Sequence, residues 1–268
     1  MTPTKKDDKV DDDHVDLWGR EESPKLSITV DSLQSQIHLL QYGSNDHRWG
    51  IHSCLWDGGI GMLCYLREHQ MADAALVIDL GAGTGIVGLG MGFRLGYQHV
   101  VLTDLPDAIP LLQENVQLNQ DIVIENGGKV VEVGVEELTW GEPCLPKALT
   151  SRILQCSRKS DPHCVYMIGA DIIYRQTLFR PLLDTMVLIW KLNDYCHCKC
   201  LFATQSTRQH LDEFYDLARR EYNMDITSLA NVTVPEGCTS CLESYVELSS
   251  VPKRGKDIIN ILEIEYKP

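Results

Sequence analysis

Residues 77–85 read VIDLGAGTG, and this stretch decides the fold that we expect for the chain. An apolar segment typical of a buried strand runs into Asp79 and then into three glycines at alternate positions. Because glycine has no Cβ atom, such a loop can turn sharply and bring its backbone against a ligand. Residues 85–95 continue in an apolar helical pattern, and the first N–H groups of a helix would point at that ligand. The stretch therefore predicts a strand, a nucleotide-binding loop and a helix at the carboxyl edge of a parallel sheet.

The glycines alone fit two cofactors. Residues 83–88 satisfy the dinucleotide pattern G-x-G-x-x-G, and Asp104 follows about twenty residues later, where a nicotinamide enzyme has its ribose-binding acid. However, Asp79 lies inside the end of the strand, where its negative charge would repel a pyrophosphate. S-adenosyl-L-methionine carries a sulfonium and an ammonium group, so an acid there favours it. We therefore expect S-adenosyl-L-methionine as cofactor and S-adenosyl-L-homocysteine as product, with a nicotinamide cofactor as the alternative.

Strands and helices alternate along the rest of the chain. We expect strands at residues 76–80, 99–103, 130–133, 165–170, 199–204, 224–232 and 258–266, and helices at 85–95, 107–119, 176–191 and 207–221. This order predicts an α/β fold, with a Rossmann-like, seven-stranded, mostly parallel sheet, helices on both faces and an antiparallel closing strand. A short β-hairpin within residues 26–42 and a helix at 56–69 precede it, while residues 141–163 read as an inserted loop.

The chain is predicted to consist of a tail and one domain. Residues 1–24 are rich in charge and have almost no periodic apolar pattern, so we expect a disordered acidic tail. Residues 25–268 are expected to form a single domain, with the hairpin and first helix in 25–72 and the catalytic core in 73–268.

Composition limits the partners of the chain. Of its 268 residues 44% are hydrophobic, which is enough for a real core, and the net charge is −14. Because a nucleic-acid binder needs a basic face, we expect no nucleic-acid partner. No stretch approaches the roughly 18 uninterrupted apolar residues of a membrane span, so no membrane association is expected. The polar, acid-rich start of the chain is unlike a targeting segment and favours the cytoplasm, with the nucleus as a further location.

Ten cysteines raise the question of a metal site. Cys238 and Cys241 form a CxxC pair, and Cys196, Cys198 and Cys200 would share one face of a strand that continues into an apolar run. Cysteines in that setting commonly pack as small hydrophobic side chains, so we expect no metal. The histidines form no recognisable ligand pattern and read as ordinary.

Five motifs together resemble one family. They are LWD at 55–57, VIDLGAGTG at 77–85, TDL at 103–105, ELTWG at 137–141 and GADIIY at 169–174. In this order, over about residues 50–205, the chain resembles the seven-β-strand (class I) protein-lysine methyltransferases, the group acting on chaperones, other ATPases and translation factors. The glycine loop is common to most S-adenosyl-L-methionine enzymes, whereas the last two motifs are much more specific. The resemblance implies an enzyme that methylates the side-chain amine of a lysine on a protein substrate, and we expect it to act as a monomer.

Residue types and the resemblance together indicate the cofactor-binding residues. The carboxylate of Asp104 can accept both ribose hydroxyls, the Trp140 ring can stack on adenine, and Asp79 would orient the cationic methionyl end. The resemblance adds contacts from the glycine loop, the end of the 165–170 strand and the helix before the first strand. The expected set is Trp56, Asp79, Gly81, Ala82, Gly83, Gly85, Asp104, Trp140 and Ala170. Helix capping by Asp104, a satisfied strand-end acid at Asp79 and core packing of the two tryptophans remain open as alternatives.

Asp171 and Tyr174 are the expected catalytic residues, because they follow a strand at the sheet edge where active sites gather. If they begin a helical turn, positions i and i+3 share a face, and both side chains would point at the methyl group. A lysine, whose ordinary pKa is about 10.4, must lose a proton before its lone pair can attack. An acidic, aromatic mouth would attract the ammonium ion, and a dry pocket beside the sulfonium would then release the amine. The structural alternatives are helix capping by Asp171 and core packing of Tyr174.

Other functions remain open at this level. One is methylation of a different acceptor, such as a histidine, an N-terminus or a small molecule, and another is a non-catalytic adaptor with the same fold. Gly58 and Gly59 stand where the family usually has small helix-forming residues. Each glycine costs about 1 kcal/mol of helix propensity relative to alanine, which predicts a looser helix start near the substrate site.

Overall fold

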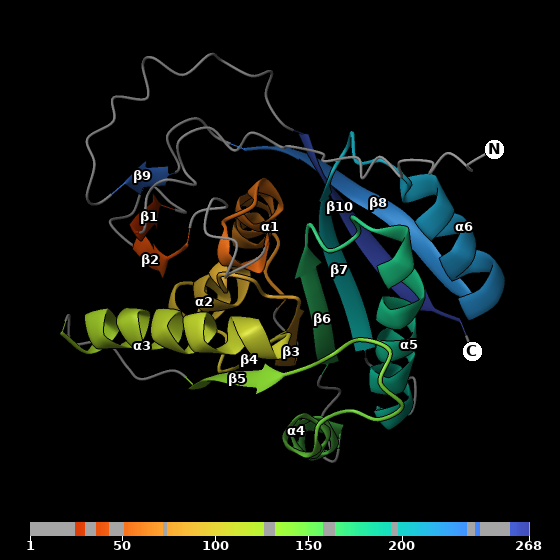
Figure 1. Ribbon diagram of the computed structural model, residues 1–268, viewed down its shortest axis with the longest axis horizontal. Coiled ribbons are helices and arrows are strands. Elements are labelled where there is room, and N and C mark those ends of the chain that lie inside the picture. The colour runs from red at the N-terminus through yellow and green to blue at the C-terminus, as the bar shows by residue number, and fades with distance from the viewer. Residues whose placement is uncertain are drawn as a thin grey trace, which may run out of the picture.

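The computed structural model describes residues 25–29, 36–42, 51–71, 74–125, 132–157, 164–193, 198–234, 239–241 and 258–267, so the predicted tail lies outside it. A seven-stranded sheet has the order β5-β4-β3-β6-β7-β10-β8 (Figure 1). Its strands are β3 (Ala74–Leu80), β4 (His99–Asp104), β5 (Glu132–Glu137), β6 (Cys164–Ala170), β7 (Cys198–Gln205), β8 (Met224–Thr233) and β10 (Ile258–Tyr266). Strands β3 to β7 are parallel, and β10 runs antiparallel between β7 and β8. The predicted sheet and its antiparallel closing strand are confirmed.

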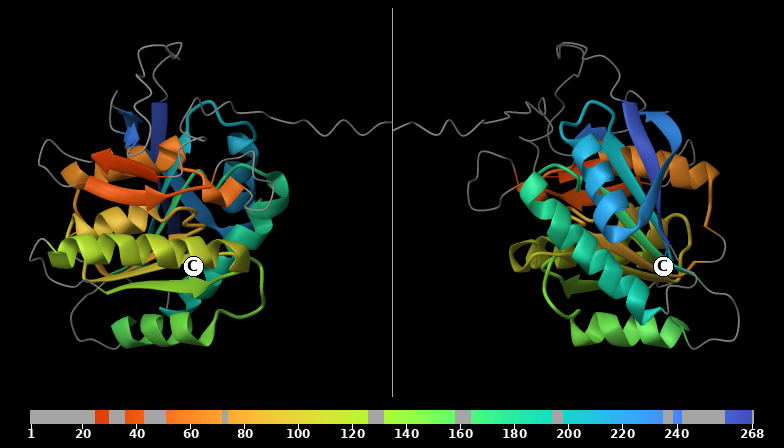
Figure 2. Two further views of the ribbon diagram at one scale, coloured as in Figure 1. Left: turned by 60° about the vertical axis from the view of Figure 1, so that its left-hand side comes forward. Right: turned by 90° about the vertical axis from the view of Figure 1, so that its right-hand side faces the viewer.

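Helices cover both faces of this sheet (Figures 1 and 2). One face carries α1 (Asp57–Glu68), α2 (Ile86–Phe93) and α3 (Ile109–Glu125), and the other carries α4 (Lys147–Ser157), α5 (Gln176–Leu192) and α6 (Leu211–Tyr222). Alternate residues of a strand point to opposite faces. Thus β6 gives Val165 and Met167 to the core under α4–α6, and Tyr166 and Ile168 to the core under α1–α3. Burial on both faces explains why the strands read as nearly continuous apolar runs.

Residues 141–163, predicted to be an inserted loop, include helix α4, so that prediction is wrong. Leu145, Leu149 and Ile153 recur at every fourth position and are buried against the sheet. Pro146 lies just before the helix, where a missing N–H costs no intrahelical hydrogen bond. With one apolar position per turn, the helical period is hard to recognise in the sequence.

A second, smaller sheet joins segments far apart in the sequence. β1 (Lys25–Thr29) and β2 (Gln36–Leu40) form the predicted antiparallel hairpin. A third strand, β9 (Thr239–Cys241), pairs with the free edge of β1 and is too short to show a pattern in the sequence. Since β9 lies between β8 and β10 in the chain, the connection between these two strands returns to the hairpin (Figure 1).

Two buried asparagines of α3 hold the hairpin on the large sheet. The side chain of Asn115 accepts the Leu40 N–H at 2.6 Å and donates to the Leu40 carbonyl oxygen at 3.0 Å. Asn119 bonds His38 in the same way, at 3.0 and 2.6 Å. Helix α3 therefore pairs with β2 much as another strand would. Asn115 Nδ2 also donates to the carbonyl oxygen of Thr84 at 2.9 Å, which links the hairpin to the glycine loop.

No helix among the described residues is long and apolar enough to cross a membrane. The described histidine, cysteine and acidic side chains form no group of three that could hold a metal ion. Cys198 and Cys200 of β7 face the same core, and burial raises the pKa of the Cys200 thiol well above its usual value, as for a packed side chain. Cys196 and Cys238 lie outside the described residues.

The chain reverses its direction across the sheet next to β3. From β3 it continues to β4 and β5 on one side, and it then returns to β6 and β7 on the other. In open α/β sheets, ligands bind outside the carboxyl ends of the strands at such a switch point. The fold therefore places a site where β3, β4 and β6 end.

Candidate active site

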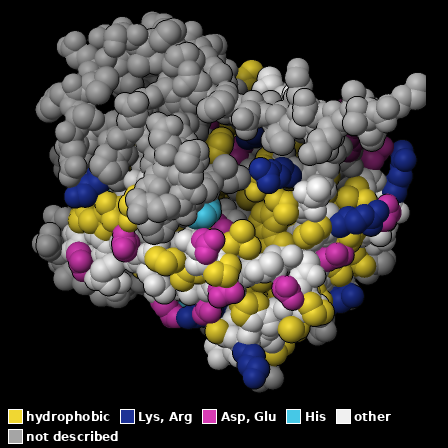
Figure 3. Space-filling view, viewed as in Figure 1, with side chains coloured by type: hydrophobic (Ala, Val, Ile, Leu, Met, Phe, Trp, Pro, Cys, Tyr) yellow, Lys and Arg dark blue, Asp and Glu magenta, His cyan; other side chains and the backbone are white. Residues whose placement is uncertain are grey.

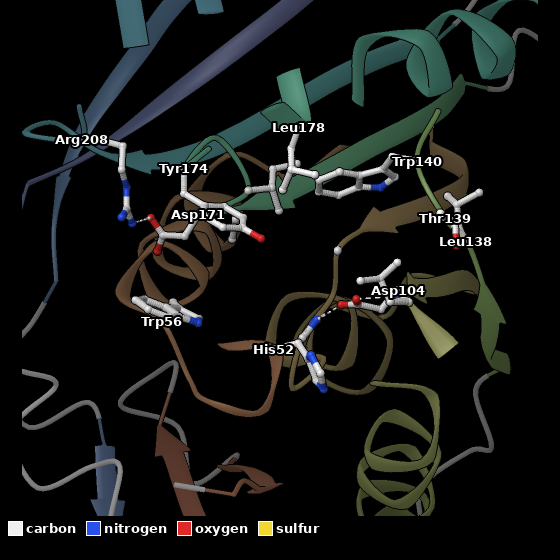
Figure 4. Close-up of a pocket in the computed structure, with 15 residues that line it drawn as sticks. His52, Trp56, Asp104, Leu138, Thr139, Trp140, Asp171, Tyr174, Leu178 and Arg208 are labelled. Atoms are coloured by element: carbon white, nitrogen blue, oxygen red, sulfur yellow. Dashed lines mark hydrogen bonds and ion pairs between the residues drawn. The ribbon is translucent and has the colours of Figure 1, made fainter. Parts of the chain in front are cut away.

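A cavity of about 210 Å³ opens at the carboxyl ends of β3, β4 and β6. It is lined by His52, Trp56, Gly81, Gly83, Asp104, Leu105, Leu138, Thr139, Trp140, Ala170, Asp171, Ile172, Tyr174, Leu178 and Arg208. Figure 4 shows the two ends of this cavity. One, called the Arg208 end, is formed by Trp56, Asp171, Tyr174 and Arg208. The other, called the Asp104 end, is formed by Asp104 and Trp140.

The glycine loop lines the cavity with backbone. Gly81 and Gly83 have φ of +66° and +57°, in the left-handed region that favours glycine. A Cβ atom on Gly81 would lie 2.9 Å from Cζ2 of Trp140, and one on Gly83 would lie 3.1 Å from the carbonyl oxygen of His52. The absence of these side chains therefore lets the Trp140 ring and the His52 backbone approach the loop closely.

Two expected loop residues, Ala82 and Gly85, do not line the cavity. The Ala82 N–H donates to the Thr103 carbonyl oxygen at 2.9 Å, and the Gly85 N–H donates to the Ala82 carbonyl oxygen at 2.7 Å. Gly85, with φ of +84°, is also the N-cap of α2. Both residues shape the loop from within, and their contact with a cofactor stays a prediction.

Asp104, at the end of β4, is oriented by two backbone donors. Oδ2 accepts the Gly83 N–H at 2.7 Å, and Oδ1 accepts the Leu105 N–H at 2.7 Å. Burial raises the pKa of Asp104, while these two hydrogen bonds and the nearby His52 act in the opposite direction. Because each carboxylate oxygen has two lone pairs, both keep one for a ligand diol.

Asp79 is buried beneath the glycine loop and is absent from the cavity wall. Its Oδ2 accepts the N–H of Gly88, in the first turn of α2, at 3.1 Å. Burial raises the pKa of Asp79 to about 7; the Gly88 hydrogen bond opposes this rise and the charge of Asp104 adds to it. A cationic ligand above the loop would favour the ionised form of this carboxyl group.

Trp140 is held over Gly81 by the turn that follows it. Gly141, with φ of +84°, donates its N–H to Thr185 Oγ1 at 3.0 Å, and Thr185 donates to the Pro181 carbonyl oxygen at 2.9 Å. A Cβ atom on Gly141 would lie 3.1 Å from that of Pro181, which is inside α5. Helix α5 thus fixes the turn that presents the indole ring to the cavity.

Asp171 connects three segments at the Arg208 end. Its φ of +54° turns the chain sharply after β6, and α5 begins only at Gln176, so the helical turn expected at 171–174 is wrong. Oδ2 accepts the Gly58 N–H at 2.7 Å, in the first turn of α1, and Oδ1 lies 3.2 Å from Nη2 of Arg208. Burial raises the pKa of Asp171, and both Arg208 and Gly58 oppose that rise. The helix that Asp171 caps is α1, which packs from across the site, and not the helix that follows it.

The two glycines at the start of α1 make room for their neighbours. A Cβ atom on Gly58 would lie 2.4 Å from Asp171 Oδ2, and one on Gly59 would lie 2.5 Å from Cγ2 of Ile86. Their departure from the family pattern therefore accompanies close packing against the site, which composition alone does not reveal.

Tyr174, Trp56 and Ala170 complete the predicted part of the wall. Burial raises the pKa of the Tyr174 phenol. The charge of Arg175 lowers this pKa and the charge of Asp104 raises it further. The phenol is therefore protonated at neutral pH. In Figure 4 Trp56 lies beside Asp171 at the Arg208 end. The Tyr174 phenol oxygen points toward the middle of the cavity in the same view.

His52 and Arg208 also line the cavity, although the sequence does not predict them there. Nε2 of His52 is buried and has no hydrogen-bond partner in the described part of the chain. The Arg208 side chain is 16% exposed and comes from the connection between β7 and α6, where no motif marks it. Most of the remaining unpredicted wall is apolar. On the face seen in Figure 3, hydrophobic side chains gather near the centre with charged ones around them.

Comparison with known proteins finds one family and several similar chains. A family described as lysine methyltransferase matches residues 34–221. EEF1A lysine methyltransferase 3 of Xenopus tropicalis is 33% identical over 155 residues, which are 57% of this chain and 58% of that protein. Protein N-lysine methyltransferase METTL21A of Danio rerio is 33% identical over 153 residues, 56% of this chain and 60% of that protein. The chain thus spans about three fifths of the length of these relatives.

Among solved structures, a ribosomal protein L11 methylase from Lactobacillus delbrueckii subsp. bulgaricus is 13% identical, with a TM-score of 0.42 over 79% of this chain and 77% of that one. The family match covers well over half of the chain and confirms the resemblance seen in its motifs. The chain therefore belongs to the lysine methyltransferase family.

Proposed function

We propose that the chain uses S-adenosyl-L-methionine to methylate the side-chain amine of a lysine in a protein substrate. The observation that carries this proposal is the single cavity that joins the glycine loop, Asp104 and Trp140 to Asp171 and Tyr174. A cofactor at the Asp104 end and a lysine at the Arg208 end would meet in its middle. Membership of the lysine methyltransferase family supports the same activity.

The residues at the Asp104 end fit S-adenosyl-L-methionine. The free lone pairs of Asp104 suit the two ribose hydroxyls, and the Trp140 ring suits adenine. Gly81 lines the cavity and would offer loop backbone to the methionyl part, while Asp79 beneath the loop would provide negative charge for its cationic groups. When bound, this cofactor supplies a methyl group on a cationic sulfur, and its transfer to a neutral amine leaves S-adenosyl-L-homocysteine and one proton for water.

The Arg208 end would position the lysine. Trp56 and Tyr174 offer aromatic faces for the methylene groups and the nitrogen. Asp171 accepts a hydrogen bond on each oxygen, so we assign it a positioning role and not that of a general base. The main contribution of this end would be alignment of the nitrogen with the methyl group and exclusion of water.

The names of the relatives suggest the first substrate to test. One relative is named for EEF1A. The motif resemblance implies enzymes that act on chaperones, other ATPases and translation factors. We therefore propose a protein of this kind as substrate, which would place the activity in the cytoplasm.

Transfer of a labelled methyl group from S-adenosyl-L-methionine to the proteins of a cell extract tests the proposal. We expect a discrete labelled protein whose hydrolysate contains methyl-lysine, and loss of that label with Asp104→Ala. Calorimetry should show that S-adenosyl-L-homocysteine binds more tightly than NAD.

Other outcomes would contradict the proposal. Label on histidine or on a small molecule would assign a different acceptor. Cofactor binding without any transfer would favour an adaptor, and tighter binding of NAD would favour a nicotinamide enzyme.

A further inference from the structure

Arg208 places a positive charge in the wall of a cavity that, under the proposed function, receives a lysine. Its side chain is 16% exposed, and Nη2 lies 3.2 Å from Oδ1 of Asp171, whose side chain is 2% exposed. Asp171 is in turn fixed by the Gly58 N–H at 2.7 Å. Because water hardly reaches this pair, its charges are weakly screened, and the geometry holds both groups in place.

The charged groups around this pair come from several elements. Asp57 of α1 faces Asp171, and Tyr174 faces both Arg175 and, from the other end, Asp104. Behind Arg208 lies a separate polar pocket whose titratable lining residues are His210, Asp212, Glu213 and Tyr215. Within it Glu213 pairs with His210 at 2.7 Å. In the cavity itself, Asp171 and Arg208 are the opposed charges of the Arg208 end.

The protonation state of the acceptor decides what this pair does. An ammonium ion has no lone pair and cannot accept a methyl group. An unpaired carboxylate at the Arg208 end would bind that unreactive form tightly. We propose that Arg208 is a specificity-determining residue that, by pairing with Asp171, leaves this end without net negative charge, so that the cavity takes the neutral amine of the target lysine over its ammonium ion. This inference rests on the proposed function and adds a role for a residue that no motif marks.

The test begins with Arg208→Gln, which removes the charge and keeps a donor toward Asp171. In single-turnover transfer to the labelled extract protein, we expect the midpoint of the pH–rate profile to rise by about one pH unit or more, with a rate about tenfold lower at pH 7. Arg208→Lys should keep the wild-type midpoint. Arg180→Gln removes an exposed cation of α5 that pairs with Glu221 and should change nothing.

A binding measurement tests the same point without catalysis. n-Butylamine has the four carbons and the amine of a lysine side chain, and its ammonium form predominates at pH 7. In calorimetry on the S-adenosyl-L-homocysteine complex, we expect this probe to bind Arg208→Gln about tenfold more tightly than the wild type. Asp171→Asn leaves Arg208 unpaired and should weaken binding, and the double variant Asp171→Asn/Arg208→Gln should return the pH midpoint toward that of the wild type.

Two results would overturn the proposal. One is an equal loss of rate by Arg208→Gln at every pH, and the other is unchanged n-butylamine binding in both single variants. If Arg208→Gln does not fold, judged by thermal unfolding, the comparison of Asp171→Asn with the double variant decides. Failure of the wild type to methylate any lysine would contradict the proposed function. The comparison of n-butylamine binding would still test the role of Arg208, because it needs no methyl transfer.

Discussion

At Gly58 the absence of one carbon atom permits the hydrogen bond on which the Arg208 end depends. A Cβ atom there would lie 2.4 Å from Oδ2 of Asp171, a short side chain held at both oxygens. Overpacking of this kind costs about 1–3 kcal/mol. We expect Gly58→Ala to lower the free energy of unfolding by about that amount, although alanine is the better helix former, and to slow methyl transfer by about tenfold. Chemical unfolding and single-turnover rates measure the two effects.

Gly134→Ala is the matched control for this substitution. A Cβ atom on Gly134 of β5 would lie 3.4 Å from Nη2 of Arg152, which is ordinary contact. Its free energy of unfolding should change by no more than about 0.5 kcal/mol. If Gly58→Ala and Gly134→Ala changed the free energy of unfolding and the methyl-transfer rate equally, Gly58 would have no special role at the site.

Asp79 makes stability depend on pH. Its pKa is raised from 3.8 to about 7 in the folded protein, chiefly by burial, so the folded state holds its proton more tightly than the unfolded state does. Stability is therefore greatest below the unfolded pKa and falls as pH rises from about 4 to about 7, by up to about 4 kcal/mol.

Asp79→Asn keeps a neutral acceptor for Gly88 and should flatten this decline, making the variant more stable than the wild type at pH 8. Chemical unfolding at a series of pH values measures it. The raised pKa values of Asp104 and Asp171 act in the same direction, so part of the decline should persist. If the stability of Asp79→Asn fell with rising pH as steeply as that of the wild type, Asp79 would not be the group responsible for the decline.

Part of the site could be predicted from sequence, because part of it lies in contiguous motifs. Asp104 and Trp140 each follow a recognisable strand or turn pattern, and both line the cavity. Arg208 meets Asp171 across 37 residues, and Gly58 meets it across 113. Contacts of that separation are created by the fold, so neither the ion pair nor the need for Gly58 is visible in one sequence.

At the scale of elements, α3 and β2 are held together by amide side chains, and the two asparagines form a natural pair of tests. Both are fully buried and bond the β2 backbone, but only Asn115 also reaches the Thr84 carbonyl oxygen. Each change to leucine leaves buried backbone groups unsatisfied, at about 1–3 kcal/mol per group. We expect both variants to lose about 2–4 kcal/mol of stability and to speed hydrogen exchange at His38 or Leu40.

Only Asn115→Leu should also weaken the binding of S-adenosyl-L-homocysteine in calorimetry, because only Asn115 supports the glycine loop. Gln117→Leu, at an exposed position of the same helix, is the control. Equal cofactor affinity in the two asparagine variants would show that the hairpin and the loop are independent.

The sequence predicted elements where their apolar period was strong. The hairpin, helices such as α5 and most strands of the large sheet are confirmed close to their expected bounds, whereas β5, expected at 130–133, lies at Glu132–Glu137. Helix α4 was missed because it has one buried position per turn, and β9 because three residues carry no period. The alternation of strands and helices predicts a mostly parallel sheet. It does not predict which strands are neighbours, because strand pairing depends on contacts between residues far apart in the chain.

For the whole molecule, the charge of −14 predicts how a substrate is attracted. An acidic protein draws a basic segment toward it, and salt screens that attraction over a Debye length of about 10 Å at 0.1 M. We expect the KM for a protein substrate to rise several-fold from about 0.05 M to about 0.3 M salt, with kcat nearly constant. Steady-state kinetics measure this, and a KM independent of salt would leave the charge a role in solubility alone.

Deletion of residues 1–24 tests the predicted division into a tail and a single domain. The tail is rich in charge, and we expect its removal to leave the thermal midpoint of unfolding unchanged, as measured by calorimetry. A lower midpoint would show that these residues belong to the folded unit.

Because β10 lies between β7 and β8, the strand that completes the sheet is the last of the seven to leave the ribosome. Until Ile258–Tyr266 emerges, β7 has an open edge of unpaired N–H and C=O groups, and β8 has no neighbour in the sheet. In the same way, the edge of β1 that pairs Leu26 with Cys241 stays unpaired until β9 has been synthesised. In the interval between the synthesis of β7 and that of β10, the nascent chain therefore exposes an unpaired strand edge, and it should depend on chaperones during that interval.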